Sequence, residues 1–358
     1  MGEERKEVRV GRGAVSNRAG RFEPREVEAV DDGWGSLDEA LPPLHTEVRP
    51  DPARSIIARN KSPDIGFSQS INPYRGCEHG CIYCYARPSH AYVNLSPGLD
   101  FETKLFFKQD AAKLLEQELA ASSYQCSPII IGANTDPYQP IERELKVTRS
   151  VLEVLQRHRH PLSIITKSAM VERDIDILSE MARARLAHVT ISITSLNAEI
   201  KRTLEPRTAS PQARLRAVRR LSEAGVDVSV MVAPVIPVLT DAELEDILAA
   251  AAAAGARGAG YVLLRLPYEI KDLFREWLEV HEPLKAKHVM SRMRAMRGGR
   301  DYDSRWGVRQ KGVGEYAQLL QRRFELACER AGLNRTRFSH DTSLFNKPEL
   351  GPQQYALL

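Results

Sequence analysis

The chain has 358 residues, of which 42% are hydrophobic and 27% are charged. This composition is typical of a globular protein, and the length allows one large domain or two ordinary ones. No apolar run approaches the roughly 20 residues that cross a bilayer, so we expect a soluble protein without a membrane partner. The Arg- and Glu-rich N-terminus lacks the apolar region of a signal peptide, which makes the cytoplasm the expected compartment.

The net charge is only +4, but the charge is unevenly distributed. Between His281 and His340 there are 14 Lys and Arg residues against 6 Asp and Glu residues, a balance of +8. Such a bias is typical of a solvated helical face, and it is also typical of a surface that binds an anionic partner such as nucleic acid. Both readings stay open on the sequence alone.

The pattern along the chain predicts three regions. Residues 1–54 lack periodicity and mix Gly, Pro, Arg and acidic residues, so we expect an extended and partly disordered N-terminal arm. Residues 55–265 alternate short β-branched apolar runs with helical patterns, which indicates βα units around a parallel sheet. Residues 266–358 form a basic extension that is mostly helical in pattern. The fold class is therefore α/β.

Six strands and eight helices are predicted from periodicity and from start and stop signals. The expected strands are Gly66–Asn72, Pro128–Gly132, Leu162–Thr166, His188–Ile193, Asp227–Ala233 and Gly260–Leu264. The expected helices are Gln109–Ala121, Glu144–Arg157, Asp174–Ala184, Pro211–Ala224, Asp241–Ala254, Phe274–His281, Lys285–Arg297 and Glu315–Gly332. Six βα units with right-handed crossovers make either a partial or full barrel or an open sheet, with the chemistry at the carboxyl ends of the strands.

Three of the five cysteines follow the first expected strand, in the sequence RGCEHGCIYCYARP. Cys77, Cys81 and Cys84 have Cys-x3-Cys-x2-Cys spacing, which is typical of metal ligands rather than disulfides. Three thiolates leave one iron of a cubic 4Fe-4S cluster open, and an open iron can bind a substrate or cofactor. Cys126 and Cys328 stand alone and are expected to be small buried side chains, so no second cluster is predicted.

Two other readings of the cysteine loop remain. A zinc site could use the three cysteines with His79 or His90, in a nucleic-acid-binding protein without redox chemistry, although structural zinc sites usually arrange their ligands as two separated pairs. The cysteines could also be incidental. If the histidines are not ligands, we expect them to lie near the cluster or to face a substrate.

The cysteine loop resembles that of the radical S-adenosylmethionine (SAM) superfamily, over about Phe67 to Leu264. The resemblance implies a partial (βα)6 barrel, one 4Fe-4S cluster on the three cysteines, and Tyr83 against the adenine of SAM. In that family the open iron chelates SAM, and one electron cleaves the cofactor to a 5'-deoxyadenosyl radical that abstracts a substrate hydrogen. A reductant such as flavodoxin or ferredoxin is then an expected partner, and the substrate stays unknown.

Within this superfamily the chain is most similar to a bacterial group in the branch that contains spore photoproduct lyase. The strings INPYRGCEHGCIYCYARPSHAY, ANTDPYQPIE and GGRDYDS carry this resemblance. It implies catalytic positions at Tyr85, which follows the third cysteine, and at Asn134, which stands where the lyase has the cysteine that quenches its product radical. That departure argues against photoproduct repair as the reaction.

Polar residues at the other strand ends supply candidate SAM contacts. The cofactor brings a carboxylate and a ribose diol, so its site needs a cation and several hydroxyl or amide partners. Lys167 resembles the branch's lysine contact to the SAM carboxylate. The remaining candidates are Thr135, Asp136, Ser192, Thr194 and Arg207.

The Arg-rich segment HVMSRMRAMRGGRDYDSRWG follows the last strand. Met290, Met293 and Met296 recur every three residues, which is typical of a buried helix face. Arg292, Arg294, Arg297 and Arg300 are the residues that could bind the phosphates of a nucleic acid.

Overall fold

The computed structural model describes residues 8–23 and 44–349 of the chain. Its main sheet has the strand order β10-β9-β8-β7-β6-β3-β2. In the described residues six strands run parallel in chain order, namely β3 (Gln69–Ile71), β6 (Ile129–Ile131), β7 (Leu162–Thr166), β8 (Ala187–Ser192), β9 (Asp227–Val235) and β10 (Gly258–Leu263). The edge strand β2 (Ile57–Arg59) pairs antiparallel with β3. The sequential order confirms the expected α/β fold, and the two free edges make the barrel a partial one.

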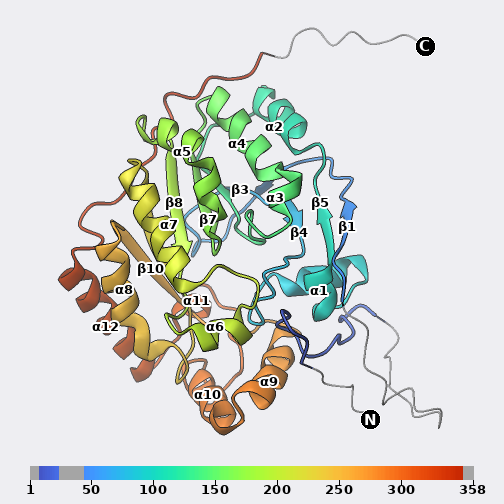
Figure 1. Cartoon of the computed structure of the whole chain (residues 1–358), viewed down its shortest axis with the longest axis vertical. Coiled ribbons are helices and arrows are strands. Elements are labelled where there is room, and N and C mark those ends of the chain that lie inside the picture. The colour runs from blue at the N-terminus through green and yellow to red at the C-terminus, as the bar shows by residue number, and fades with distance from the viewer. Residues whose placement is uncertain (1–7, 24–43, 350–358) are drawn as a thin grey trace.

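The parallel strands are apolar because helices cover them on one side while side chains fill the barrel interior on the other. All three residues of β6 are buried, as are five of the six in β8. The covering helices are α2 (Ala111–Ala120), α4 (Val147–Arg157), α5 (Ile175–Ala182), α7 (Pro211–Glu223) and α8 (Leu244–Ala253), with the short helices α3 (Glu142–Leu145), η2 (Ala169–Asp174) and η3 (Asp241–Glu243) at their N-terminal sides. Figure 1 shows the covering helices side by side around the outside of the sheet.

Several short elements around the cysteine loop are absent from the sequence prediction. A second sheet has the order β1-β5-β4, and a short helix, α6, follows β8. These elements are β1 (Glu47–Pro50), β4 (Tyr74–Arg75), β5 (Lys104–Phe107), η1 (Arg87–Val93), α1 (Leu99–Thr103) and α6 (Ala198–Leu204). Each is too short to show a periodicity, which is why the pattern along the chain does not reveal them.

The C-terminal extension covers the barrel in two places. Its helices are α9 (Ile270–His281), α10 (Pro283–Ala295), α11 (Val308–Lys311) and α12 (Glu315–Ala331). Helix α12 packs against α8 and α11 against β10, while α9 and α10 pack together near α6 (Figure 1). Met290, Met293 and Met296 are buried, which confirms the apolar face predicted for this segment.

The described part of the N-terminal arm lies against the cysteine loop. A Cβ atom at Gly13 would be 1.8 Å from the carbonyl oxygen of Gly80, so only glycine allows this approach. The backbone amides of Gly13 and Ala14 donate to the Glu102 carboxylate at 3.0 and 2.9 Å, and Ser16 donates to Glu276 of α9 at 2.6 Å. The arm thus connects α1 to α9, although much of it, residues 1–7 and 24–43, lies outside the described residues.

Among the helices that the structure describes, none combines the length and the apolar character that crossing a membrane requires.

Candidate active site

Cys77, Cys81 and Cys84 lie on the loop between β4 and η1, at the carboxyl end of β3. Cys77 and Cys81 are buried and Cys84 is half-buried. Burial raises the pKa of the Cys77 thiol, and the nearby charges of Asp136, Cys81 and Cys84 raise it further. Backbone hydrogen bonds from Gly80 to Cys77 at 3.3 Å and from Cys84 to Cys81 at 3.2 Å hold the three cysteines on two consecutive turns.

The donor set of this loop fits a cubane cluster. Three cysteine thiolates match the ligands of a 4Fe-4S cluster with one open iron, and each thiolate of such a cluster binds a different iron. Within residues 8–23 and 44–349, the His, Cys, Asp and Glu side chains form no group of three or more that could hold a single metal ion. Bound iron also favours thiolate over thiol, which offsets the effect of burial on these cysteines.

A buried arginine holds the backbone of the cysteine loop. The Arg87 guanidinium is fully buried and donates to the carbonyl oxygens of Cys81 at 2.9 Å, Gly80 at 3.1 Å and Gly98 at 2.8 Å. Its charge is paired with the equally buried carboxylate of Glu102. These contacts fix the conformation of the loop before any metal binds. The sequence offered one signal for this role, an arginine inside the cysteine motif itself.

Asp136 joins the cysteine loop to the ends of β6 and β7. Its carboxylate accepts hydrogen bonds from the Thr166 hydroxyl and the Lys167 amide, both at 2.7 Å, and lies 3.3 Å from Nδ1 of His79. Burial alone would raise the pKa of Asp136, but His79 and these hydrogen bonds hold it at about 2. Thr135 donates to the carbonyl oxygen of Tyr74 at 2.7 Å. Both predicted SAM contacts are therefore engaged in positioning the loop, and their contact with the cofactor stays a prediction.

Tyr83 and Thr194 meet at a buried ion pair. The Tyr83 hydroxyl donates to Glu205, and the Thr194 hydroxyl donates to the same carboxylate at 2.6 Å. Arg214 of α7 forms the ion pair with Glu205. Burial opposes ionisation, yet Arg214 and then Lys167 lower the pKa of Glu205 to about 2. Sequence reasoning missed Glu205, which lies within the motif LEPRT, and Arg214, which follows it.

Lys167 and Ser192 are placed beside this group. The Lys167 ammonium lies 5.8 Å from the centroid of the Tyr83 ring. Ser192 is buried at the end of β8, and its carbonyl oxygen accepts from Arg214 at 2.9 Å. Arg207, which is partly exposed, comes to the cysteine loop through an ion pair with Glu78 at 3.1 Å. Lys167 is thus brought to Tyr83, Ser192 is joined to the same group through Arg214, and Arg207 reaches the cysteine loop at Glu78.

Tyr85 and Asn134 lie at the open side of the site. Tyr85 is 44% exposed, and its hydroxyl donates to the carbonyl oxygen of Ala133. The neighbouring Asn134 is exposed and is linked through its backbone amide to Asn72 at 2.8 Å. Arg265, which sequence reasoning missed, lies 4.5 Å from the centroid of the Tyr85 ring.

The family model of the radical SAM superfamily matches residues 71–251, which is half of the chain and includes the three cysteines. The chain belongs to the radical SAM superfamily. This family accounts for the partial barrel and for the cysteine loop at the carboxyl end of its first parallel strand.

Similar sequences occur in distant organisms. A protein of Mycobacterium tuberculosis (strain H37Rv) is 38% identical over 231 residues, 63% of this chain and 68% of the relative. A protein of Methanocaldococcus jannaschii is 30% identical over 191 residues, which cover 53% of this chain and 68% of the relative.

Solved structures with the same fold include spore photoproduct lyase complexed with dinucleoside spore photoproduct. Its TM-score is 0.56 at 17% identity, and the match covers 80% of each chain. A mutant of that lyase with bound AdoMet and the same ligand has a TM-score of 0.54, also at 17% identity. At this level of identity the similarity concerns the fold.

One expectation for a single side chain is wrong, and it concerns Cys126. The sequence predicts that His90 lies near the cluster or faces a substrate; it is fully buried, packs on Phe101 with ring centroids 5.1 Å apart, and contacts the Lys104 carbonyl oxygen at 2.9 Å, so it does not face a substrate and lies beside the cysteine loop. Cys328 is buried as expected, but Cys126 is only half-buried.

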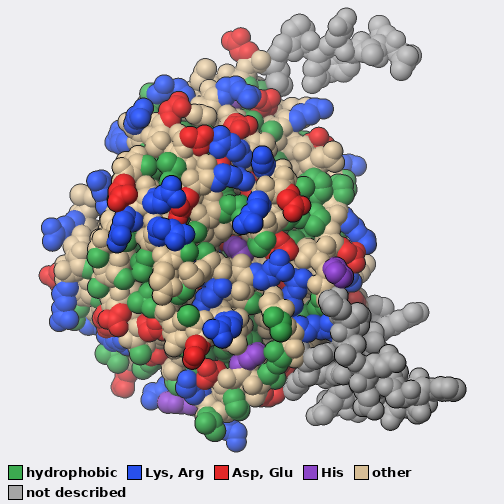
Figure 2. All heavy atoms as spheres, viewed as in Figure 1, with side chains coloured by type: hydrophobic (Ala, Val, Ile, Leu, Met, Phe, Trp, Pro, Cys, Tyr) green, Lys and Arg blue, Asp and Glu red, His purple; other side chains and the backbone are tan. Residues whose placement is uncertain are grey.

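The four arginines considered for phosphate binding do not share one exposed face. Arg297 is 1% exposed, Arg294 pairs with Asp301 at 2.8 Å, and Arg292 lies over the Tyr316 ring at 5.3 Å. Of these four arginines, only Arg300 is exposed and has no ion pair or ring contact among the described residues. On the face shown in Figure 2, basic and acidic side chains are interspersed. Nucleic acid as a partner therefore stays a prediction, and the buried Arg297 is not available to contact it.

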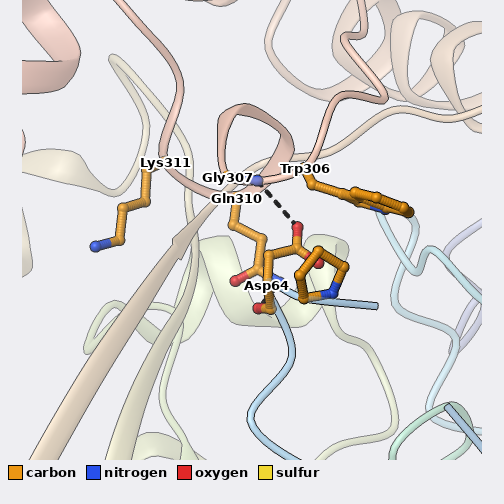
Figure 3. A pocket seen from close by; sticks show the side chains of 6 residues that line it. Asp64, Trp306, Gly307, Gln310 and Lys311 are labelled. Carbon is orange, nitrogen blue, oxygen red and sulfur yellow. Dashed lines mark hydrogen bonds between the residues drawn. The ribbon is translucent and has the colours of Figure 1, made fainter. Parts of the chain in front are cut away.

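A shallow pocket of about 500 Å³ lies away from the cysteines (Figure 3). It is lined by Pro63, Asp64, Trp306, Gly307, Gln310 and Lys311. The Asp64 carboxylate, which is drawn toward Gly307 in Figure 3, is neutralised by Arg309. The pocket lies in the seam where the C-terminal extension meets the β2–β3 loop, and it contains none of the strand-end residues of the site.

Proposed function

We propose that the chain is a radical SAM enzyme that binds one 4Fe-4S cluster through Cys77, Cys81 and Cys84. The observation that carries the proposal is the loop itself, because three neighbouring thiols lie at the carboxyl end of β3 with a cation and an aromatic ring beside them. The fold and the family membership support the same conclusion.

When bound, the cluster and SAM supply a one-electron cleavage that yields a 5'-deoxyadenosyl radical, which removes a hydrogen atom from the substrate. The residues of the chain position these groups and exclude water. Arg87 and Asp136 hold the loop, and the Glu205–Arg214 pair holds Tyr83 in place.

Lys167 is the residue we assign to the SAM carboxylate. It is half-buried and has no ion pair with a carboxylate in the part of the chain that the structure describes. Glu205, whose carboxylate feels the charge of Lys167, is already paired with Arg214. A positive charge that is free to bind beside Tyr83 fits an amino-acid carboxylate.

The test is anaerobic purification of the full chain, followed by iron analysis and a SAM cleavage assay with a chemical reductant. We expect about four irons per chain, a brown colour, and release of methionine and 5'-deoxyadenosine. Replacing Cys77, Cys81 and Cys84 together by Ala removes all three signals, while the control C126A/C328A retains them. Stoichiometric zinc without iron, or about eight irons per chain, would contradict the proposal.

A physiological reductant such as flavodoxin or ferredoxin, and the substrate itself, are open parts of this proposal. Replacing the chemical reductant by either protein in the same assay tests the first. The range of possible substrates is limited by the barrel opening, where Tyr85 and Asn134 are exposed.

A further inference from the structure

Arg265 lies directly beyond the carboxyl end of β10 and contacts Tyr85 on the cysteine loop. β10 and β3 are separated by four strands in the sheet order, so this contact crosses the mouth of the partial barrel. The cation thus lies over the opening through which a substrate would reach the cysteines.

The stacking leaves the hydrogen-bonding edge of Arg265 available. The side chain is half-buried, and among the described residues it has no carboxylate within ion-pair distance. A guanidinium that lies on an aromatic face keeps its N–H groups directed outward in the plane of the group. This is the arrangement in which arginine binds a carboxylate or a phosphate through two parallel hydrogen bonds.

A second arginine adds positive charge behind Arg265. Arg297 is 1% exposed and donates to the carbonyl oxygens of Leu264, at 3.0 Å, and Val308. Its Nε atom has no hydrogen-bond partner in the structure described here. Carbonyl oxygens satisfy donors without neutralising a charge, and a buried charge without a counterion is costly.

The groups that face Arg297 do not neutralise this positive charge. The pKa of Arg297 is lowered to about 10, chiefly by burial and also by the charge of Arg265, although Tyr302 and Asp303 raise it. Asp303 is the only acidic group among these neighbours, and its carboxylate is bound by Arg305 at 2.6 Å. The two arginines therefore favour an anion at the mouth of the barrel.

We propose that Arg265, supported by Arg297, binds an anionic group of the substrate, a phosphate or a carboxylate, at the mouth of the barrel. This inference rests on the proposed function and names the substrate class for the same site. The site then has two distinct anion-binding positions. Lys167 beside Tyr83 binds SAM, and Arg265 beside Tyr85 binds the substrate.

The experiment measures binding of inorganic phosphate and of acetate to the cluster-loaded full chain, from the rise in unfolding temperature at constant ionic strength. Wild type is compared with R265Q and with the control R257Q. Arg257 lies at the opposite end of β10, with its side chain 75% exposed, so its loss leaves the mouth unchanged. We expect the dissociation constant of the preferred anion to rise at least about tenfold in R265Q and to stay constant in R257Q. The anion that binds more tightly identifies the anionic group of the substrate.

Equal losses in the two variants, or no anion effect in wild type, would overturn the inference. Repeating the titration in saturating SAM gives the third outcome. If SAM abolishes anion binding, Arg265 belongs to the cofactor site and the inference is wrong, whereas additive stabilisation supports it. The iron content and the SAM cleavage of the wild-type chain test the proposed function separately, so a failure of the anion site is distinguishable from a failure of the proposed function.

Discussion

At the scale of single residues, Lys167 is the clearest determinant of SAM affinity. Its ammonium lies near the Tyr83 ring and has a free hydrogen-bonding capacity toward a carboxylate. Losing a charge-assisted hydrogen bond costs about 1.5 to 3 kcal/mol, which is roughly 10- to 150-fold in affinity. For K167A we therefore expect weaker SAM binding by calorimetry with the iron content unchanged. K113A, on the exposed face of α2, serves as the control, and wild-type affinity in K167A would remove the lysine from the site.

The buried pair of Arg87 and Glu102 supports the cysteine loop, and breaking it should be costly. In E102Q the Arg87 guanidinium stays buried without a counterion, and the amides of Gly13 and Ala14 lose a charged acceptor. Removing one partner of a buried ion pair typically costs about 3 to 5 kcal/mol. Chemical denaturation should show this loss in the free energy of unfolding.

The control for this prediction is an exposed ion pair on α4. Arg149 and Glu153 are 3.1 Å apart, and the Glu153 side chain is 50% exposed. Pairs of this kind contribute at most about 1 kcal/mol. If E102Q is no less stable than E153Q, the loop does not depend on the buried pair.

At the scale of elements, the parallel strands and their covering helices could be predicted because each repeats one pattern over enough residues. The predicted strand Leu162–Thr166 coincides with β7, and the buried methionine face of α10 also follows from its spacing. The same alternation of strands and helices also predicts that the cysteine loop and Lys167 lie just beyond the ends of their strands.

What the sequence does not reveal is how polar residues choose partners once the chain has folded. Asp136 and Thr135 carry the same signals as ligand-binding residues, but Asp136 accepts a hydrogen bond from the Lys167 amide beyond β7 and Thr135 donates to the Tyr74 carbonyl oxygen before the cysteine loop. Arg265 and Glu205 become functional candidates only because the barrel brings distant segments together. Such contacts depend on tertiary geometry and have no pattern along the chain.

The start of α7 gives a prediction for a whole element. Ser210 accepts a hydrogen bond from the Ala213 amide at 3.2 Å, and Pro211 occupies the first turn. Replacing such a cap by Ala costs about 1 kcal/mol, while Gly costs only a few tenths. We expect S210A to lower the free energy of unfolding by about this amount and S210G by much less. Equal losses for both variants would show that the side chain acts through packing instead.

At the scale of the whole molecule, the N-terminal arm and the C-terminal extension both stabilise the mouth of the barrel. Ser16 and Arg18 of the arm bind Glu276 of α9, at 2.6 and 2.7 Å, and Trp277 of the same helix donates to Thr203 of α6 at 3.1 Å. The site is thus enclosed by segments from both ends of the chain.

Three histidines distributed over the fold determine its acid stability. Burial lowers the pKa of His90, His160 and His188 to about 4 in each case. In the unfolded chain their pKa is about 6.5, so unfolding takes up protons once the pH falls below that value. The free energy of unfolding is therefore unaffected by these histidines above about pH 6.5, and it falls as the pH falls toward 4. Within this window each histidine lowers the free energy of unfolding by about 1.4 kcal/mol per pH unit.

A single substitution separates this effect from other acid-sensitive groups. His160 contacts the Tyr124 hydroxyl at 2.6 Å and the Pro161 carbonyl oxygen at 3.0 Å, and glutamine can hydrogen-bond in its place without binding a proton. In H160Q the free energy of unfolding should fall less steeply between pH 6.5 and 4, because unfolding takes up about one proton fewer. Because cluster loss and carboxylate protonation act equally on both proteins, they cancel in the difference between wild type and variant. Identical slopes for wild type and H160Q would mean that His160 is protonated in the folded state and does not contribute to acid unfolding.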